Sequence, residues 1–335
     1  MNHRYLSAHR VLPVLVAIMW LGLAPSADQS AAPAAKPAAP SQAKTWSVPK
    51  TPWGHPDLQA IWNNDAENAI PLEVQAERPR APRPEGAGPG LGGPSHWGEG
   101  ARGAEDPASA RKSLIVDPPD GKLPPLTPEA QKRADAKAAE QRGSGLAGAM
   151  ARLHAWDHCI TRGVPDSMLP RLYSNNYQIV QTPEYVAIFH EMIHDTRIIP
   201  LDGRPHLPDN IRLWMGDSRG RWEGNTLVVE TKNFNGKTEN NLIPHQGAGS
   251  YRGPTDSLHL VERFTRVSND VLEYRFTVND PKLYTRPWTA LLNLTTRNSP
   301  DVIFEYACHE GNYAVPNTIT GALVEEAAAA KEKGR

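Results

Sequence analysis

The chain shows no excess of charge of either sign. Its 36 Lys and Arg residues nearly match its 37 Asp and Glu residues, so the formal net charge is -1. A protein whose main partner is nucleic acid normally needs a basic surface that neutralises phosphates. We therefore expect no nucleic-acid partner, and no sequence pattern predicts a cofactor.

Long hydrophobic runs are also lacking. The apolar run near the N-terminus extends only over Val11–Leu23, which is too short to favour a permanent membrane span. Arg4 and Arg10 precede this run and small residues follow it up to Ala27, as is typical of a secretory signal peptide. We predict a signal peptide over residues 1–27 and a mature chain that is periplasmic or secreted, with no stable membrane span after cleavage.

Cysteine is nearly absent, since the chain contains only Cys159 and Cys308. Neither has a second cysteine close by, which disfavours a zinc site built on cysteine. In the oxidising compartment that export implies, one disulfide between the two is the simpler interpretation, and two buried free thiols are the alternative. The disulfide would close a loop of roughly 150 residues and stabilise the fold by about 4 kcal/mol in the loop-entropy model.

Proline and glycine are abundant, with 32 and 26 residues, and they concentrate toward the N-terminal half. We expect residues 28–44, which are rich in Ala and Pro, to form a disordered tether because they contain no core-forming side chains. We interpret residues 45–156 as an extended arm with loops and short helices, and we expect Trp53 and Trp62 to dock this arm against the main body.

Two short helices are predicted inside the arm. Thr127 is a good N-cap, and Pro128 suits the first helical position. We expect the first helix to extend to about Gln141 and a second helix to cover residues 146–156.

After Cys159 the sequence changes to short apolar and β-branched runs between turn signals, which are typical of strands. We expect strands over residues 177–182, 185–191, 197–201, 212–215, 226–231, 258–267, 271–279, 288–296 and 302–307. Short connections at 223–225 and 268–270 predict tight hairpins. We therefore predict a mainly β domain over residues 157–318, in which an antiparallel meander forms a lipocalin-like barrel or a two-sheet sandwich. A C-terminal tail over 319–335 follows.

Residues His190–His194 spell the H-E-x-x-H motif of zinc peptidases. That motif needs a helix, which places both histidines on one face. Here Tyr185–Phe189 are strand formers, and in a strand His190 and His194 would lie about 13 Å apart, too far to share one metal ion. We therefore disfavour a metal site at His190 and His194, and with it the zinc metallopeptidase that the motif would indicate.

Residues Gly216–Gly220 spell the G-x-S-x-G motif of serine hydrolases. The motif requires a helix directly after the serine, whereas a predicted strand follows here at 226–231. We interpret Ser218 as an ordinary turn serine.

Polar residues surround both cysteines. Asp157 and His158 precede Cys159, and His309 and Glu310 follow Cys308. A disulfide would bring these side chains into one neighbourhood, where an acid–base pair or a metal site can form. The alternative is a set of polar residues at a sheet edge.

A second polar group, in a predicted turn, contains Asp202, Arg204 and His206. Arg204 is a candidate for binding an anionic ligand through two hydrogen bonds, although arginine in such turns often only binds backbone carbonyls. Together with the residues after Cys308, this group gives the candidate catalytic residues Asp202, His206, His309 and Glu310.

Large aromatic residues are spread along the predicted β domain. Trp214, Trp222, Tyr274 and Trp288 are candidates for the wall of a ligand cavity, and core packing is the alternative.

Several segments resemble a large family of exported proteins of soil bacteria without an established activity. The likeness extends from about Trp46 to Asn317 and is carried by PWGHPDLQAIW, IIPLDGRPH, GDSRGRWEGNTLVVET and FEYACHEGNY. It implies a strand-rich exported protein but no reaction or catalytic residue. Members often carry arginine at the position of His158 and vary around His190, which argues against metal sites at both positions.

Taken together, these features predict an exported β protein that binds a small organic ligand. The alternative is a hydrolase, lyase or isomerase on the same scaffold that uses His, Asp and Glu as acid–base residues. The sequence leaves the oligomeric state and the identity of the ligand open.

Overall fold

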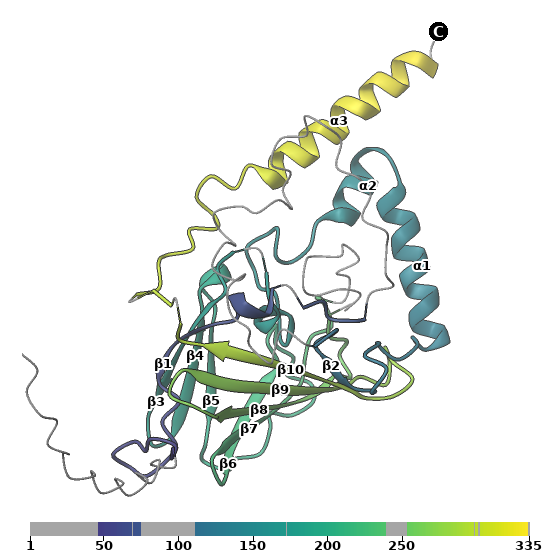
Figure 1. Ribbon diagram of the computed structural model, residues 1–335. Coiled ribbons are helices and arrows are strands. Elements are labelled where there is room, and N and C mark those ends of the chain that lie inside the picture. The colour runs from purple at the N-terminus through teal and green to yellow at the C-terminus, as the bar shows by residue number, and fades with distance from the viewer. Residues whose placement is uncertain are drawn as a thin grey trace, which may run out of the picture. The chain divides into compact units, whose positions relative to one another are not determined.

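The computed structural model describes residues 46–68, 70–74, 111–171, 173–238, 253–297, 299–300 and 302–333 (Figure 1). The predicted signal peptide over residues 1–27 and the predicted tether over 28–44 lie outside these residues. None of the helices in the described part combines the length and apolar character that crossing a membrane requires.

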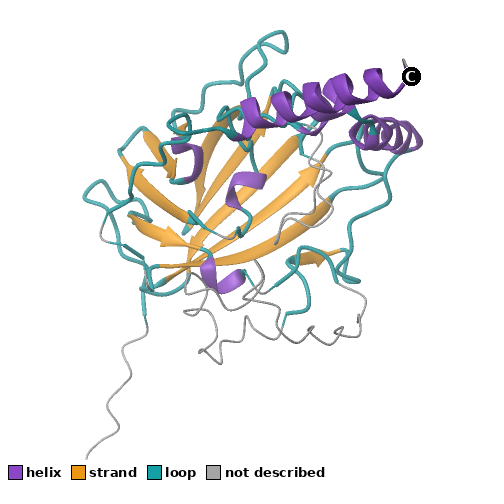
Figure 2. Ribbon diagram, turned by 90° about the horizontal axis from the view of Figure 1, so that it is seen from above, coloured by secondary structure: helices purple, strands orange, loops and turns teal. Residues whose placement is uncertain are grey.

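A single sheet of ten antiparallel strands organises the described residues (Figure 2). The strand order is β5-β4-β3-β1-β10-β9-β8-β7-β6, and β2 pairs with β10 outside this path. The strands are β1 (Ala60–Asn63), β2 (Ile115–Asp117), β3 (Asn176–Gln181), β4 (Tyr185–His190), β5 (Thr196–Pro200), β6 (Asp217–Glu223), β7 (Thr226–Lys232), β8 (His259–Arg266), β9 (Val271–Asn279) and β10 (Trp288–Thr295). The prediction of a mainly β antiparallel fold is confirmed.

Strand β1 joins two meanders. It pairs with β3 of the meander β3–β4–β5, and Asn63 pairs with Thr295 at the end of β10, which belongs to the meander β6–β10. The predicted arm therefore contributes a strand to the sheet, with Trp62 fully buried in it.

The two edge strands of the sheet, β5 and β6, meet through side chains, and the described residues form no backbone pairing between them. The missing side chain of Gly220 in β6 allows this approach, because a Cβ atom there would lie 2.8 Å from both Ile199 Cγ2 and Leu201 Cδ2. The structure is thus a curled meander and not the closed lipocalin-like barrel that was one predicted alternative.

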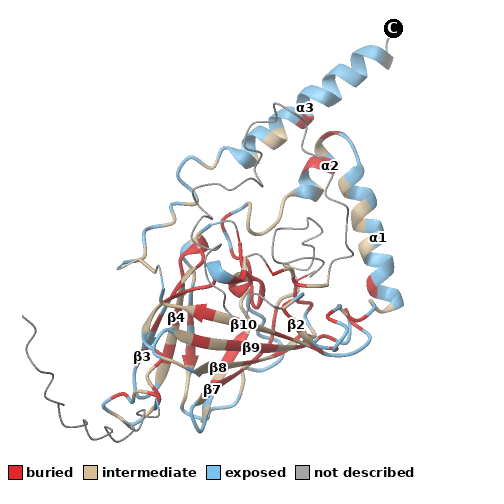
Figure 3. Cartoon of the chain, in the orientation of Figure 1, coloured by how far each residue is buried: buried red, intermediate tan, exposed pale blue. Residues whose placement is uncertain are grey.

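The enclosed side of the sheet carries an apolar core. Buried and half-buried residues alternate along β9 (Figure 3), and the buried ones are Leu272, Tyr274, Phe276 and Val278. This is the period of two that a strand with one wet face requires. The neighbouring strands β8 and β10 follow the same alternation, so the core extends continuously across the sheet.

A buried polar network lies between the edge strands. Arg197 of β5 donates to Ser218 Oγ of β6 at 2.9 Å, to Thr231 Oγ1 of β7 at 2.7 Å and to Glu262 Oε1 of β8 at 2.9 Å. The Tyr274 hydroxyl donates a hydrogen bond to the same Glu262 oxygen at 2.8 Å. The Arg197 and Glu262 side chains are only 3% and 0% exposed, so each charge depends on the other for compensation.

Three α-helices are present in the described residues: α1 (Pro128–Arg142), α2 (Gly145–Arg152) and α3 (Ala314–Lys333). The Thr127 hydroxyl caps α1 as predicted, by accepting from the Ala130 amide at 3.1 Å. Helix α2 ends four residues before the predicted limit, where Asp157 accepts from the His154 amide at 2.8 Å and stabilises a turn. Helix α3 begins at Ala314, inside the predicted β domain, and covers most of the predicted tail.

Several strand predictions were wrong. Residues 212–215 contribute only an isolated bridge at Leu213, and 302–307 form no strand. Ser218 was interpreted as a turn serine, but it lies within β6 and points into the buried network. The helix that the hydrolase motif needs is absent, because β6 continues through Arg219 and Gly220 into a hairpin with β7.

We predict that Gly220→Ala destabilises the fold, because the added methyl group must displace the contact between β5 and β6. Overpacking of this kind lowers the free energy of unfolding by about 1–3 kcal/mol. Gly321→Ala is the matched control, since a Cβ there meets no atom within 4 Å and alanine favours a helix. Urea denaturation of both variants measures the difference. Equal stability of the two variants would show that β5 and β6 do not pack closely.

We also predict that Glu262→Gln strongly destabilises the fold, because it leaves the buried Arg197 guanidinium without a counter-charge. Breaking such a pair costs about 3–5 kcal/mol. The control is Glu223→Gln, which disrupts exposed contacts to Arg221 and Arg263 and leaves the melting temperature nearly unchanged. Thermal denaturation compares the two, and similar melting temperatures would contradict a buried ion pair.

Candidate functional site

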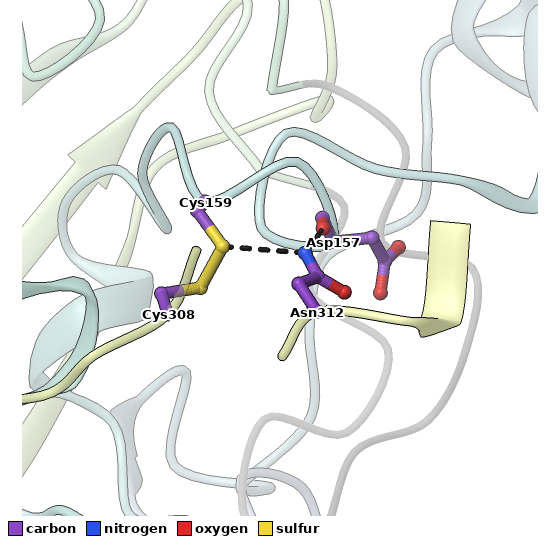
Figure 4. The surroundings of a disulfide bond; sticks show 4 residues. All are labelled: Asp157, Cys159, Cys308 and Asn312. Atoms are coloured by element: carbon purple, nitrogen blue, oxygen red, sulfur yellow. Dashed lines mark hydrogen bonds between the residues drawn. A yellow bond between two sulfur atoms is a disulfide. The ribbon is translucent and has the colours of Figure 1, made fainter. Parts of the chain in front are cut away.

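Cys159 and Cys308 form the predicted disulfide, and no free cysteine is present (Figure 4). The bond connects the loop after α2 with the segment that leads from β10 to α3, over a sequence separation of 149. Beside it, the side-chain amide of Asn312 donates from Nδ2 to the backbone carbonyl of Asp157 at 2.8 Å, and Nδ2 lies 3.4 Å from Cys159 Sγ (Figure 4). The disulfide and this amide thus fix the same two segments against each other.

A cavity of about 370 Å³ opens next to this bond, and we call it the disulfide cavity. Its volume falls within the range of small-molecule sites. It is lined by Trp156, Asp157, Glu305, Tyr306, Ala307, Cys308, Glu310, Gly311, Asn312 and Ala314.

Tyr306 holds the segment between β10 and α3, which forms most of the cavity wall, against the rest of the fold. Its ring stacks on Tyr173 with 6.5 Å between centroids and 10° between planes. Its backbone amide donates to His194 Nδ1 at 3.2 Å. Burial, assisted by the Tyr173 hydroxyl, raises the pKa of Tyr306 to about 12, so its hydroxyl keeps its proton at neutral pH.

A second, smaller cavity of about 190 Å³ shares Trp156 with the first, and we call it the basic cavity. It is lined by Lys137, Leu153, His154, Ala155, Trp156, Thr161, Arg162, Asp166, Lys237 and Thr238. The Arg162 guanidinium lies 4.2 Å from the Trp156 ring centroid.

The structure brings part of the predicted cysteine-flanking group together. Asp157 and Glu310 both line the disulfide cavity. His158 and His309 are exposed and line neither of the two cavities. Two carboxylates without an adjacent imidazole can accept hydrogen bonds or attract a positively charged group.

The residues of the predicted turn, Asp202, Arg204 and His206, have contacts that do not involve the disulfide cavity. Arg204 forms an exposed ion pair with Asp202 and lies 3.4 Å from the Tyr185 hydroxyl, so its guanidinium already has partners. His206 Nδ1 lies 2.9 Å from Asp217 Oδ2, a carboxylate that also binds Arg219. Among the described residues, no hydrogen bond or ion pair joins His206 or Asp202 to His309 or Glu310, so the candidate catalytic residues fall into two groups.

The predicted aromatic ligand residues line neither cavity. Tyr274 and Trp288 are fully buried and both pack against Phe276, with centroid distances of 5.4 and 5.6 Å. Trp222 lies 5.3 Å from the His55 ring, and Trp214 lies under Lys237. The aromatic residues at the cavities are instead Trp156 and Tyr306, whose only signal in the sequence is their closeness to the two cysteines.

The H-E-x-x-H segment forms no α-helix. His190 ends β4 and is 1% exposed, whereas His194 is exposed and is the last residue of a short 3-10 turn over Met192–His194. Burial and, to a smaller extent, Arg197 lower the pKa of His190 to about 3. The Ser167 carbonyl lies near this ring, but neither ring nitrogen has a partner in hydrogen-bonding geometry.

Where the chain is described, no three His, Cys, Asp or Glu side chains are grouped in a way that suits a metal ion. No known protein family, no curated protein and no solved structure matches the chain. The resemblance to exported proteins of soil bacteria stays a prediction.

We predict that His190 makes the fold sensitive to acid. Between the unfolded pKa of 6.5 and the folded pKa of about 3, the unfolded chain binds a proton at His190 that the folded chain excludes. Stability therefore falls as the pH drops below 6.5, with a slope approaching about 1.4 kcal/mol per pH unit from this residue. Urea denaturation at pH 6 and pH 4 should show a smaller loss in His190→Gln than in the wild type or in the exposed control His309→Gln. An unchanged loss in His190→Gln would contradict the assignment.

Proposed function

We propose that the protein is exported and binds a small organic ligand in the disulfide cavity. The observation that carries this proposal is a cavity of about 370 Å³ whose wall is fixed covalently by Cys159–Cys308, although apart from Ala314 at the start of α3 it lacks regular helix or strand structure. A preformed wall favours binding because ligand association does not have to order it. A disulfide is typical of an oxidising compartment, which supports a periplasmic or secreted location.

The lining favours a neutral or positively charged ligand that carries O–H or N–H donors. Three carboxylates, those of Asp157, Glu305 and Glu310, line the cavity, and none of the described lining residues is a lysine or an arginine. Carboxylates accept hydrogen bonds and attract cations. Trp156 and Tyr306 supply aromatic surface for the body of the ligand.

An enzyme on the same scaffold is the second candidate, in the form of a hydrolase, lyase or isomerase. Asp157 and Glu310 face one cavity from segments far apart in the sequence, and two carboxylates at one site are sufficient for acid–base chemistry when their pKa values differ. Binding is the first candidate because it requires only the cavity and its donors and acceptors.

The test is a binding screen of the full mature chain by thermal shift and calorimetry, with small aromatic amines, phenols and sugars as probes. We expect at least one probe of this class to bind, and we expect Tyr306→Leu to weaken that binding by about tenfold, which corresponds to about 1.4 kcal/mol. Tyr313→Leu is the matched control, since Tyr313 belongs to the same segment, is 70% exposed and does not line the cavity. The proposal fails if no probe binds, or if Tyr306→Leu binds the probe as tightly as the control does.

A further inference from the structure

The basic cavity contains more positive than negative charge. Among the described residues that line it are Arg162, Lys137 and Lys237, and Asp166 is the one carboxylate among them. Lys137 comes from α1, Arg162 from the loop after the disulfide cysteine, and Lys237 from the segment after β7. Folding therefore assembles these three cations from distant parts of the chain.

Of the three cations, Arg162 contributes most to the charge of the cavity, because its guanidinium is buried and is poorly screened by water. Its side chain is only 6% exposed, and its Nε has no hydrogen-bond partner. Its closest ion-pair contact is loose, at 4.0 Å between Nη1 and Asp166 Oδ2. A buried arginine is normally compensated by a close carboxylate, and this one is compensated only in part.

Asp166 cannot supply full compensation, because it also serves Arg171. The Arg171 guanidinium forms a direct ion pair with Asp166 Oδ1, so one carboxylate faces two buried guanidinium groups. Burial, followed by repulsion from Arg171, lowers the pKa of Arg162 to about 10. Arg162 nevertheless stays charged at neutral pH, which leaves an excess positive charge beside the cavity.

Two further lining residues carry buried polar atoms without a partner. These are His154 Nε2 and Thr238 Oγ1. Burial also lowers the pKa of His154, so its ring is neutral at pH 7 and contributes a hydrogen-bonding nitrogen but no charge. The cavity thus combines uncompensated positive charge with unused hydrogen-bonding capacity.

We propose that the basic cavity is a binding site for a small oxyanion of the carboxylate or phosphate class. Guanidinium groups match the geometry of both, and lysines add charge. At about 190 Å³ the cavity is smaller than sites for drug-sized molecules, so the occupant is a free small anion or the anionic end of a longer molecule. The site differs from the disulfide cavity in the sign of its charge and does not depend on the function proposed there.

The experiment is calorimetry of the full mature chain with two probes, succinate and inorganic phosphate, at constant ionic strength and with glycerol as the neutral control. We expect saturable binding of at least one oxyanion and none of glycerol. Succinate alone assigns the carboxylate class, phosphate alone assigns the phosphate class, and both together assign a general oxyanion site. Absence of binding by both oxyanions overturns the proposal.

Two variants test whether the oxyanion binds in the basic cavity. Lys137→Gln combined with Lys237→Gln should weaken it by at least about tenfold, since each removed charge is worth about a factor of five at a partly exposed position. Lys132→Gln is the matched control, because Lys132 lies on the same helix α1 but is exposed and does not line the cavity. Oxyanion binding that survives in the double variant overturns the proposal.

A third variant separates this site from the disulfide cavity. Tyr306→Leu should weaken oxyanion binding less than the lysine double variant does, because Tyr306 lines the disulfide cavity and not the basic cavity. Loss of oxyanion binding in Tyr306→Leu, with Lys137→Gln/Lys237→Gln unaffected, would place the anion at the other site.

Discussion

The ion pair between Arg197 and Glu262 is the interaction on which the curled sheet depends. The sheet brings its edge strands β5 and β6 together without backbone pairing, and Arg197 extends from β5 to side chains of β6, β7 and β8. Burying the Arg197 guanidinium would be costly without a counter-charge, and Glu262 supplies that charge. The positive charge of Arg197 also lowers the pKa of His190, in addition to the effect of burial. The Arg197 guanidinium donates a hydrogen bond to the Ser218 hydroxyl, which occupies that hydroxyl as an acceptor.

Local sequence patterns predicted most of the sheet. The alternation along β9, the hairpin turns and the Thr127 cap each depend on neighbouring residues, and the structure contains all of them. Strand β6 was missed because Asp217, Ser218 and Gly220 have low strand propensity, and their strand depends on partners at β5 and β7. Residues 302–307 were predicted as a strand from their apolar pattern, but they pair with no strand among the described residues.

The candidate site was less predictable. The disulfide follows from the number of cysteines, and Asp157 and Glu310 follow from their closeness to it. Arg162 had no such signal, because its significance arises from burial beside Arg171 and from lysines that are distant in sequence. A charge imbalance within a fold is a property of packing, so no count of charges along the chain reveals it, least of all in a chain whose overall charges nearly cancel.

The position of Cys159–Cys308 makes the cavity wall sensitive to oxidation. Most of this wall belongs to the segment after β10, the last strand of the sheet, and the disulfide ties that segment to the loop after α2. In a reducing environment the bond does not form, and the segment then keeps only non-covalent contacts, such as those of Tyr306 and Asn312 and the packing of α3 on α2. The shape of the cavity wall therefore depends on the redox state of a single pair of cysteines.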